Sequence, residues 1–371
     1  MTSKQKRILG VVLGMAVVLI AGVCFYQRNK TFHKYKVKEE TKIDAGYNYH
    51  YLPFGDALLK YSADGAAYFN ADGEIWNESY EIQSPIADAC GDYAVIADQN
   101  SNKVYVFNKE KLQGTMETDY PIVKVQVSRQ GVVAAILEDD TASYIQMMNK
   151  EGEVLVERKT VLSKTGYPMD FSMSEDATKM IVSYVYIEGT EVKSKVVFYH
   201  FGDVGKEQED NIVGGFNQYR ETLVPDVEFV NEDTAIAIGD NMFTIYSIVD
   251  KPSVIYEDKI EKEIQKVFYS KNYFGMIFDS GDEKKPYQAV VYDLTGKKVM
   301  DTTYSGNYKE VKLDGKNLLL YGDTECKVIT FDGKVRFDYK MKKTINGMYV
   351  TDQTYRYILL TDNKIQTIEL R

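Results

Sequence analysis

The feature that most constrains this chain is a pattern of strands and turns that recurs from about residue 47 to residue 371. Each copy holds runs of alternating apolar residues and a short hairpin, usually turned by a Gly, and the copies follow one another about every 40 residues. Tandem strand-rich repeats of this length are typical of β-propellers. The hairpins include Tyr68–Ile75, Val104–Lys109, Met148–Val154, Val291–Lys297 and Ile329–Val335.

Eight repeat units can be counted by aligning their first strands. Several of these strands open with Pro, which is tolerated at the first position of a strand. Ile122–Arg129 and Ile264–Lys271 also share the pattern Ile-x-Lys-Val-x-x-Ser followed by a basic residue. The sequence therefore predicts an all-β, eight-bladed propeller, with seven blades and an irregular first unit as the alternative. The units start near residues 47, 85, 121, 168, 225, 264, 308 and 345.

The last unit is one strand short. Residues 345–371 supply three apolar runs, and then the sequence ends. An unpaired sheet edge favours aggregation, and propellers avoid it by closing their ring. We therefore expect Tyr35 to Ile43 to supply the missing outer strand, within a propeller domain that covers residues 35–371.

Charge is divided unevenly along the chain. Residues 1–38 hold eight Lys/Arg and no Asp/Glu, whereas Glu39 onward holds 37 Lys/Arg and 55 Asp/Glu. An acidic body lacks the basic surface that drives binding to a phosphate backbone, so nucleic acid is not an expected partner. The same charge also serves solubility.

The N-terminal segment predicts a membrane anchor. Ile8–Tyr26 is 19 residues without a charge, long enough to cross a bilayer as a helix. It would follow a cytoplasmic tail of residues 1–7 and precede a basic stalk of residues 27–34. Cleavage as a signal peptide and lipidation at Cys24 are alternatives, although neither has a well-matched recognition sequence.

The side of the membrane is set by two opposing signals. More Lys/Arg follow the span than precede it, which by local charge favours a cytoplasmic propeller. Large folded domains, however, cross largely regardless of flanking charge. We expect a single-pass plasma-membrane protein with the propeller on the extracytoplasmic side.

Catalytic motifs are scarce. The sequence has three His, at positions 33, 50 and 200, and their spacing does not indicate a metal site. It has no Gly-x-Ser-x-Gly elbow, His-Glu-x-x-His helix or Gly-rich phosphate loop. We expect no cofactor and no disulfide between Cys90 and Cys326, which we interpret as small buried residues. A glycosidase pair of carboxylates remains an alternative, because 55 acidic residues offer many pairs.

One set of charged residues recurs at a fixed place in the repeat. It falls on the first strand of each unit, three residues after the Pro position, between mostly apolar neighbours. Because the first strand of a blade lies nearest the axis, these side chains are candidates to line the central channel and bind a polar ligand. Ion pairs between adjacent blades are the alternative. The residues are Asp88, Lys124, Glu228, Lys266 and Lys312.

Two resemblances add to this interpretation. The unit Ala67–Trp76 resembles repeats of quinoprotein-like and outer-membrane-assembly propellers, and the fold resembles WD40-like propellers; only this unit keeps the docking Trp, so quinone binding is not implied. The layout of basic N-terminus, single helix, stalk and Tyr-rich propeller is similar to that of an uncharacterised family of single-pass propeller proteins of Gram-positive bacteria. That family is classed as a domain of unknown function, and the resemblance implies no functional residues.

Taken together, these features predict a non-catalytic scaffold. We expect a membrane-anchored propeller that binds a protein of the cell envelope. The alternative is an ectodomain that binds or hydrolyses cell-wall glycan through Tyr faces and a pair of carboxylates, since the sequence holds 30 Tyr.

Overall fold

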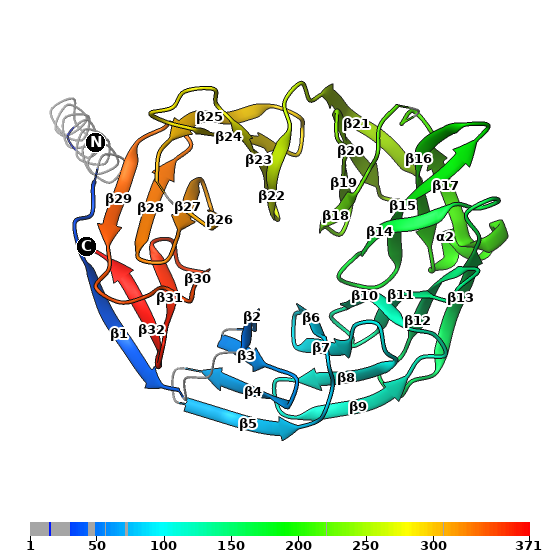
Figure 1. The fold of residues 1–371 in the computed structure, drawn as a ribbon, viewed down its shortest axis with the longest axis horizontal. Coiled ribbons are helices and arrows are strands. Elements are labelled where there is room, and N and C mark those ends of the chain that lie inside the picture. The colour runs from blue at the N-terminus through cyan, green and yellow to red at the C-terminus, as the bar shows by residue number, and fades with distance from the viewer. Residues whose placement is uncertain are drawn as a thin grey trace, which may run out of the picture.

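The computed structural model describes residues 15, 30–43, 49–55, 57–70, 73–219, 221–306 and 308–371. Their strands form eight separate four-stranded sheets arranged around a central axis (Figure 1). This confirms the all-β, eight-bladed propeller, and the seven-bladed alternative is wrong. We number the blades 1 to 8 in chain order.

Blades 1 to 4 are each built from four consecutive antiparallel strands, with the first strand nearest the axis and the fourth outermost (Figure 1). Blade 1 holds β2 (His50–Phe54), β3 (Ala57–Tyr61), β4 (Gly65–Asn70) and β5 (Gly73–Ser79); blade 2 holds β6 (Pro85–Cys90), β7 (Tyr93–Asp98), β8 (Lys103–Asn108) and β9 (Leu112–Glu117); blade 3 holds β10 (Ile122–Val127), β11 (Val133–Glu138), β12 (Ser143–Met148) and β13 (Val154–Thr160); blade 4 holds β14 (Tyr167–Met173), β15 (Lys179–Glu188), β16 (Glu191–His200) and β17 (Ile212–Phe216).

Blades 5 to 7 repeat this order, and blade 8 takes its outer strand from the other end of the chain. Blade 5 holds β18 (Asp226–Asn231), β19 (Thr234–Ile238), β20 (Met242–Ile248) and β21 (Pro252–Lys259); blade 6 holds β22 (Ile264–Ser270), β23 (Tyr273–Asp279), β24 (Tyr287–Asp293) and β25 (Lys298–Tyr304); blade 7 holds β26 (Glu310–Asp314), β27 (Asn317–Tyr321), β28 (Glu325–Thr330) and β29 (Val335–Lys340); blade 8 holds β30 (Gly347–Val350), β31 (Arg356–Thr361), β32 (Lys364–Leu370) and β1 (Tyr35–Lys42).

The ring closes through antiparallel pairing of β1 with β32. Tyr35 lies opposite Leu370 and Lys42 opposite Lys364. The backbone N–H groups of His33 and Lys34 both donate to the carbonyl of Arg371 at 2.9 Å, so the closing strand begins beside the last residue of the chain. The incomplete eighth unit of the sequence thus has its fourth strand from the N-terminal side.

The sequences of the middle strands of a blade, such as the second strand, are continuous apolar runs because these strands are buried on both faces. The second strand of blade 2 is fully covered from Ala94 to Ala97, because the neighbouring blades pack on both of its faces. The outer strand β13, by contrast, exposes Val154 and Leu155 at the rim. Apolar side chains therefore fill the spaces between blades.

Trp76 shows how neighbouring blades dock. It leaves β5 in blade 1, and its ring stacks on Phe107 of blade 2 with centroids 5.1 Å apart. Its indole N–H donates to the Lys109 carbonyl at 3.2 Å. This is the only Trp of the chain, and it locks the first blade to the second.

Blade 4 departs most from the repeat. The connection after β16 contains the short helix α2 (Asp203–Lys206) and a 3₁₀ turn (Glu209–Asn211), which lengthen this blade. The hairpin of β15 and β16 is also longer than the others, with ten residues in each strand. The sequence analysis did not predict this longer hairpin.

The expected membrane helix at residues 8–26 lies outside the described residues, apart from Met15. In the part of the chain that the structure describes, no helix has the length and apolar character needed to cross a membrane. Cys326 is buried and Cys90 is half-buried rather than buried, and both are free thiols.

Candidate functional site

The five predicted channel residues all lie on innermost strands. Each stands on the first strand of its blade, half-buried, and these strands surround the axis of the ring (Figure 1). They do not form one continuous ring of charge, because they gather into two groups. Asp88 (β6), Lys124 (β10) and Glu228 (β18) belong to the first group, and Lys266 (β22) and Lys312 (β26) to the second.

Lys124 joins blade 3 to blade 4. Its ammonium donates to the carbonyl of Phe171 at 3.0 Å and forms an ion pair with the buried Asp170. The sequence analysis missed Asp170, because counting three residues from Pro168 leads to Phe171. The register of β14 shifts between Pro168 and Asp170, as the register of β10 does between Ile122 and Lys124, so Asp170 is the counterpart of Lys124. Relative to this shift, Pro168 stands one position later in its strand than Pro121.

Lys266 makes the same contact between blades 6 and 7. Its ammonium donates to the carbonyl of Lys309 at 2.7 Å and pairs with Glu310 at 2.9 Å. The two lysines occupy equivalent places in the repeated Ile-x-Lys-Val pattern. That pattern therefore encodes a contact that fastens one inner strand to the next.

Other polar side chains of blades 2 to 4 fasten inner strands through backbone groups. In each case a side-chain oxygen on one inner strand accepts a hydrogen bond from a backbone N–H on the following inner strand, at 2.9 Å. Buried polar groups need such partners, so these contacts fix the spacing of the inner strands. The pairs are Asp88 with Val127, Gln126 with Met173, Asp170 with Val227, and Ser172 with Phe229.

Carboxyl groups crowd around Lys124. Burial raises the pKa of Glu228 to about 8; the Lys124 charge opposes this shift, and Asp226, Asp88 and Asp170 reinforce it. In the described part of the chain the Glu228 carboxyl has no hydrogen-bonding or ion-pair partner. A pKa of about 8 favours the protonated form of Glu228 at pH 7.

Two further groups complete this acidic sector, which we define as Asp88, Lys124, Asp170, Asp226, Glu228 and Tyr269. Burial raises the pKa of Asp226, and the hydroxyl of Tyr269 in blade 6 donates a hydrogen bond that opposes the shift. Burial also raises the pKa of Asp88, against the Val127 hydrogen bond. The sector thus combines one lysine with four carboxyl groups, two of which also anchor backbone N–H groups.

The second group, which we call the lysine sector, consists of Lys266, Glu310 and Lys312. Lys312 lies over the ring of Tyr349 in blade 8, with its nitrogen 4.1 Å from the ring centroid. Burial lowers the pKa of Lys312 to about 8; Glu310 opposes the shift and Lys266 adds to it. A cation over an aromatic face is stabilised by the ring, so Tyr349 compensates part of the lost hydration.

No set of three or more His, Cys, Asp or Glu with the geometry of a metal site occurs among the described residues. In the acidic sector the positive charge comes from Lys124, which pairs with Asp170.

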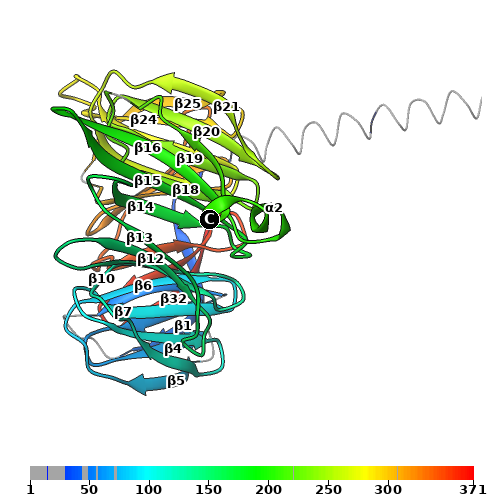
Figure 2. The same cartoon turned by 90° about the vertical axis from the view of Figure 1, so that its right-hand side faces the viewer.

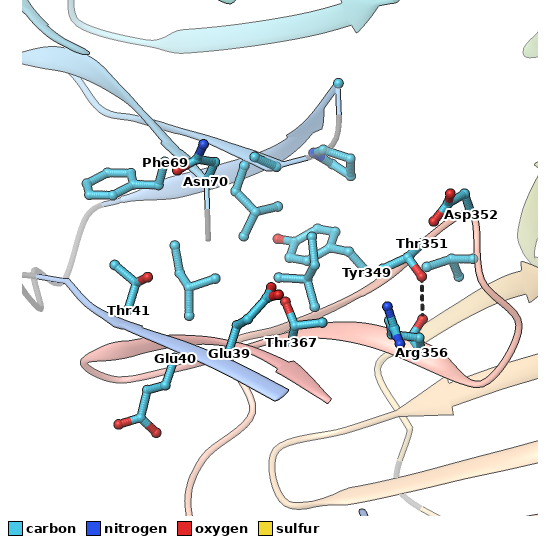
Figure 3. A pocket seen from close by; sticks show the side chains of 17 residues that line it. Glu39, Glu40, Thr41, Phe69, Asn70, Tyr349, Thr351, Asp352, Arg356 and Thr367 are labelled. Carbon is cyan, nitrogen blue, oxygen red and sulfur yellow. Dashed lines mark hydrogen bonds between the residues drawn. The ribbon is translucent and has the colours of Figure 1, made fainter. Parts of the chain in front are cut away.

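A cavity of about 390 Å³ lies where blade 8 meets blade 1 (Figure 3). Its walls are mainly apolar, with Leu58 and Phe69 from blade 1 facing Tyr349 from blade 8. Figure 3 shows Glu39, Thr367 and Arg356 on the blade 8 side, while Glu40 points away. The size is within the range of small-molecule sites, but the polar groups at its edge are of mixed charge.

The sequence matches a family model over residues 28–370, almost the whole described propeller. The chain belongs to the DUF5711 family. This is a family of unknown function, and it supports the expected resemblance to an uncharacterised propeller family. A search of curated proteins found no match.

Solved structures show the same fold at low sequence identity. The Dos1 propeller is 12% identical with a TM-score of 0.51, and the match covers 92% of this chain and 94% of that one. A eukaryotic initiation factor is 10% identical with a TM-score of 0.50, covering 89% and 83%. These likenesses support the propeller fold of this DUF5711 member and do not extend to function.

Proposed function

We propose that this protein is a non-catalytic binding module, anchored in the plasma membrane by residues 8–26, whose extracytoplasmic propeller holds a protein of the cell envelope. The observation that supports this most is the position of the chain ends. Residues 33 and 34 hydrogen-bond to Arg371, so both ends of the described propeller lie at one place. A tether at that place leaves the opposite face of the ring free for a partner.

Strand direction identifies the two faces. β32 and β16 are both third strands of their blades and run the same way through the ring, so Arg371 lies on the face where β16 ends and α2 follows. Figure 2 shows α2 on one side of the ring, with the other end of β15 and β16 on the opposite side. We call the α2 side the tether face and the opposite side the free face.

The inner-strand contacts support a rigid platform rather than an enzyme. Lys124, Asp170 and Lys266 are all engaged in contacts between blades. Acid–base catalysis needs titratable groups that can reach the reacting bond. Lys124, Asp170 and Lys266 instead hold neighbouring blades together.

A test in living cells separates the parts of this proposal. Protease added to intact cells that make the full chain should release the propeller, while chain in which residues 8–26 are replaced by a cleavable signal sequence should appear in the medium. Cross-linking of intact cells should then join the full chain to an envelope protein. Protection of the propeller from protease would contradict the extracytoplasmic side, and a chain that cross-links to no protein would contradict the binding function.

Glycan hydrolysis is the second candidate, and one observation favours it. Glu228 is a neutral acid beside ion-paired Asp170, and glycosidases combine a protonated carboxyl group with an ionised one. Incubation of the protein with cell-wall fragments tests it, with Glu228→Gln as the inactive control. Release of sugar by the wild type but not by Glu228→Gln would contradict the scaffold function and support a glycan-hydrolysing enzyme.

A further inference from the structure

The longer hairpin of blade 4 extends beyond its own sheet. The last pair between β14 and β15 joins Tyr167 to Val185, and the last pair between β16 and β17 joins Val196 to Phe216. Residues 186–193 therefore form a two-stranded arm without a neighbouring strand in blade 4. At about 3.3 Å per residue, the arm projects by roughly 10 Å. It stands on the free face.

Two connections between blades support the base of the arm. On one side, a side chain at Gly166 would lie 2.9 Å from the Val185 carbonyl, so the connection from blade 3 passes close against β15. On the other side, the Ser194 N–H donates to the Tyr219 carbonyl at 3.2 Å, and the Ser194 hydroxyl accepts from Val224 N–H at 3.3 Å. The arm is thus held upright between the two connections.

Exposed apolar side chains gather on the arm and these connections. Ile187 and Val192 are paired across the two strands and are 53% and 55% exposed. The connection from blade 3 exposes Leu162, and the connection to blade 5 exposes Leu223. Large apolar side chains grouped at a projecting tip are typical of a protein contact, because burying them there is favourable.

Carboxylates border these apolar groups. Glu188 and Glu191 flank the apolar pair, with side chains 67% and 70% exposed, and Lys193 pairs with both. Asp240 accepts a hydrogen bond from the Leu223 N–H at 3.2 Å. Within residues 186–193 the two carboxylates outnumber the buried Lys193 and leave one negative charge. Lys195 lies at the base of the arm, over the rings of Tyr184 and Tyr186, and Asp240 adds a carboxylate toward blade 5.

We propose that this arm surface, Leu162, residues 186–193 and Leu223, docks a polypeptide segment that presents apolar side chains flanked by Lys or Arg. The proposal rests on the binding function above and names the chemistry of its partner. Apolar side chains of the segment would cover Ile187 and Val192, and its basic groups would face Glu188, Glu191 and Asp240. Charge complementarity of this kind sets the choice of partner and the rate of association.

The experiment places a photoreactive phenylalanine analogue at position 192 of the full chain, in cells that make it, and identifies the cross-linked segment by mass spectrometry. The matched control carries the analogue at position 155, on the outer rim, where Val154 and Leu155 are 52% and 53% exposed. We expect position 192 to capture envelope-protein segments with an apolar core and neighbouring Lys or Arg, and position 155 to capture none of them.

Two variants sharpen the result. The first removes both carboxylate partners of the buried Lys193, so its fold is checked separately. I187S with E188Q/E191Q, added to the chain labelled at 192, should reduce the yield about tenfold, as expected for losing ~1.4 kcal/mol of binding energy. V154S/L155S in the same chain should leave the yield unchanged. Circular dichroism and melting temperature confirm that each variant is folded.

The outcomes distinguish the docking surface from the binding function. Segments captured at 192 that are acidic or lack basic residues would overturn the proposed chemistry. Capture at 155 but not at 192 would overturn the arm surface while leaving the binding function standing. Failure of both positions, together with failure of general cross-linking, would overturn both.

Discussion

The acidic sector of blades 2 to 6 and the lysine sector of blades 6 and 7 use the same lysine contact in opposite surroundings. Lys124 and Lys266 each reach the next inner strand, where they bind a backbone carbonyl and a carboxylate. Around Lys124 the excess charge is negative and Glu228 keeps its proton; around Lys266 it is positive and Lys312 has a lowered pKa. The repeated Ile-x-Lys-Val pattern therefore connects neighbouring inner strands in both sectors. Burial and the charged residues around each lysine determine how the pKa values of Glu228 and Lys312 shift.

The largest expected effect is on the pH dependence of stability in Glu228→Gln. Native Glu228 holds its proton up to about pH 8, while the unfolded chain releases it near the ordinary value of 4.5. Between these values the native state binds more protons, so the free energy of unfolding falls as pH rises, by about 1 kcal/mol per unit. Gln cannot ionise, so the variant should lack this fall and gain roughly 3 kcal/mol relative to wild type between pH 5 and pH 8.

Urea unfolding at pH 5, 6, 7 and 8 measures this difference. Glu263→Gln, at an exposed position in the connection between blades 5 and 6, is the matched control. Parallel profiles for Glu228→Gln and wild type would show that Glu228 is ionised at pH 7 and that the acidic sector is more solvated than its burial implies.

Lys124→Met should lower the free energy of unfolding by about 2 to 3 kcal/mol at pH 7. The loss comes from Asp170, which is buried among three other carboxyl groups and would lose its ion-pair partner. Thermal and urea unfolding both report it. Lys124→Met with Asp170→Asn should recover part of the loss, and a double variant as unstable as the single one would contradict the ion pair as the cause.

Lys312→Met should change stability in the alkaline range, with the opposite sign to Glu228. The unfolded lysine holds its proton up to about pH 10.5 and the native one up to about pH 8. Between these values the unfolded state binds more protons, so the wild-type free energy of unfolding gains a contribution that rises with pH. The variant should lack this rise, worth about 1 to 2 kcal/mol between pH 8 and pH 10. Equal slopes for wild type and variant would contradict the lowered pKa.

Lys266→Met should have the smallest effect, below about 1 kcal/mol at pH 7. Its partner Glu310 has a side chain 45% exposed, so water can replace the lost ammonium. A melting-temperature series beside Lys124→Met tests the comparison directly. Equal losses in the two variants would mean that the surroundings of the motif do not matter.

The architecture could be predicted from the sequence because it is encoded many times over. Eight first strands carry similar apolar patterns. Because the last unit lacks a strand, the sequence also predicts that Tyr35 and the residues after it supply the missing strand. Charged positions on inner strands could be predicted in the same way, since they recur at one place in the repeat. Repetition makes each unit evidence for the others.

The details that failed depend on single exceptions to the repeat. Asp170 was missed because Pro168 stands one position later in its strand than Pro121 does, relative to the register shift that β10 and β14 share. The arm was not predicted, because the length of a repeat unit does not show whether its additional residues extend a strand or a loop. The cavity between blades 8 and 1 was not predicted either, since its walls combine Leu58 and Tyr349 from opposite ends of the chain.

The pairing of β1 with β32 has a consequence for the order of folding. β1 is among the first parts of the described chain to be synthesised, yet its backbone partner ends at Leu370, one residue before the last. The strand must therefore remain unpaired until β32 has been made, and the loop that it closes is nearly as long as the propeller. A chaperone that shields this strand during synthesis would protect the protein at its most vulnerable stage.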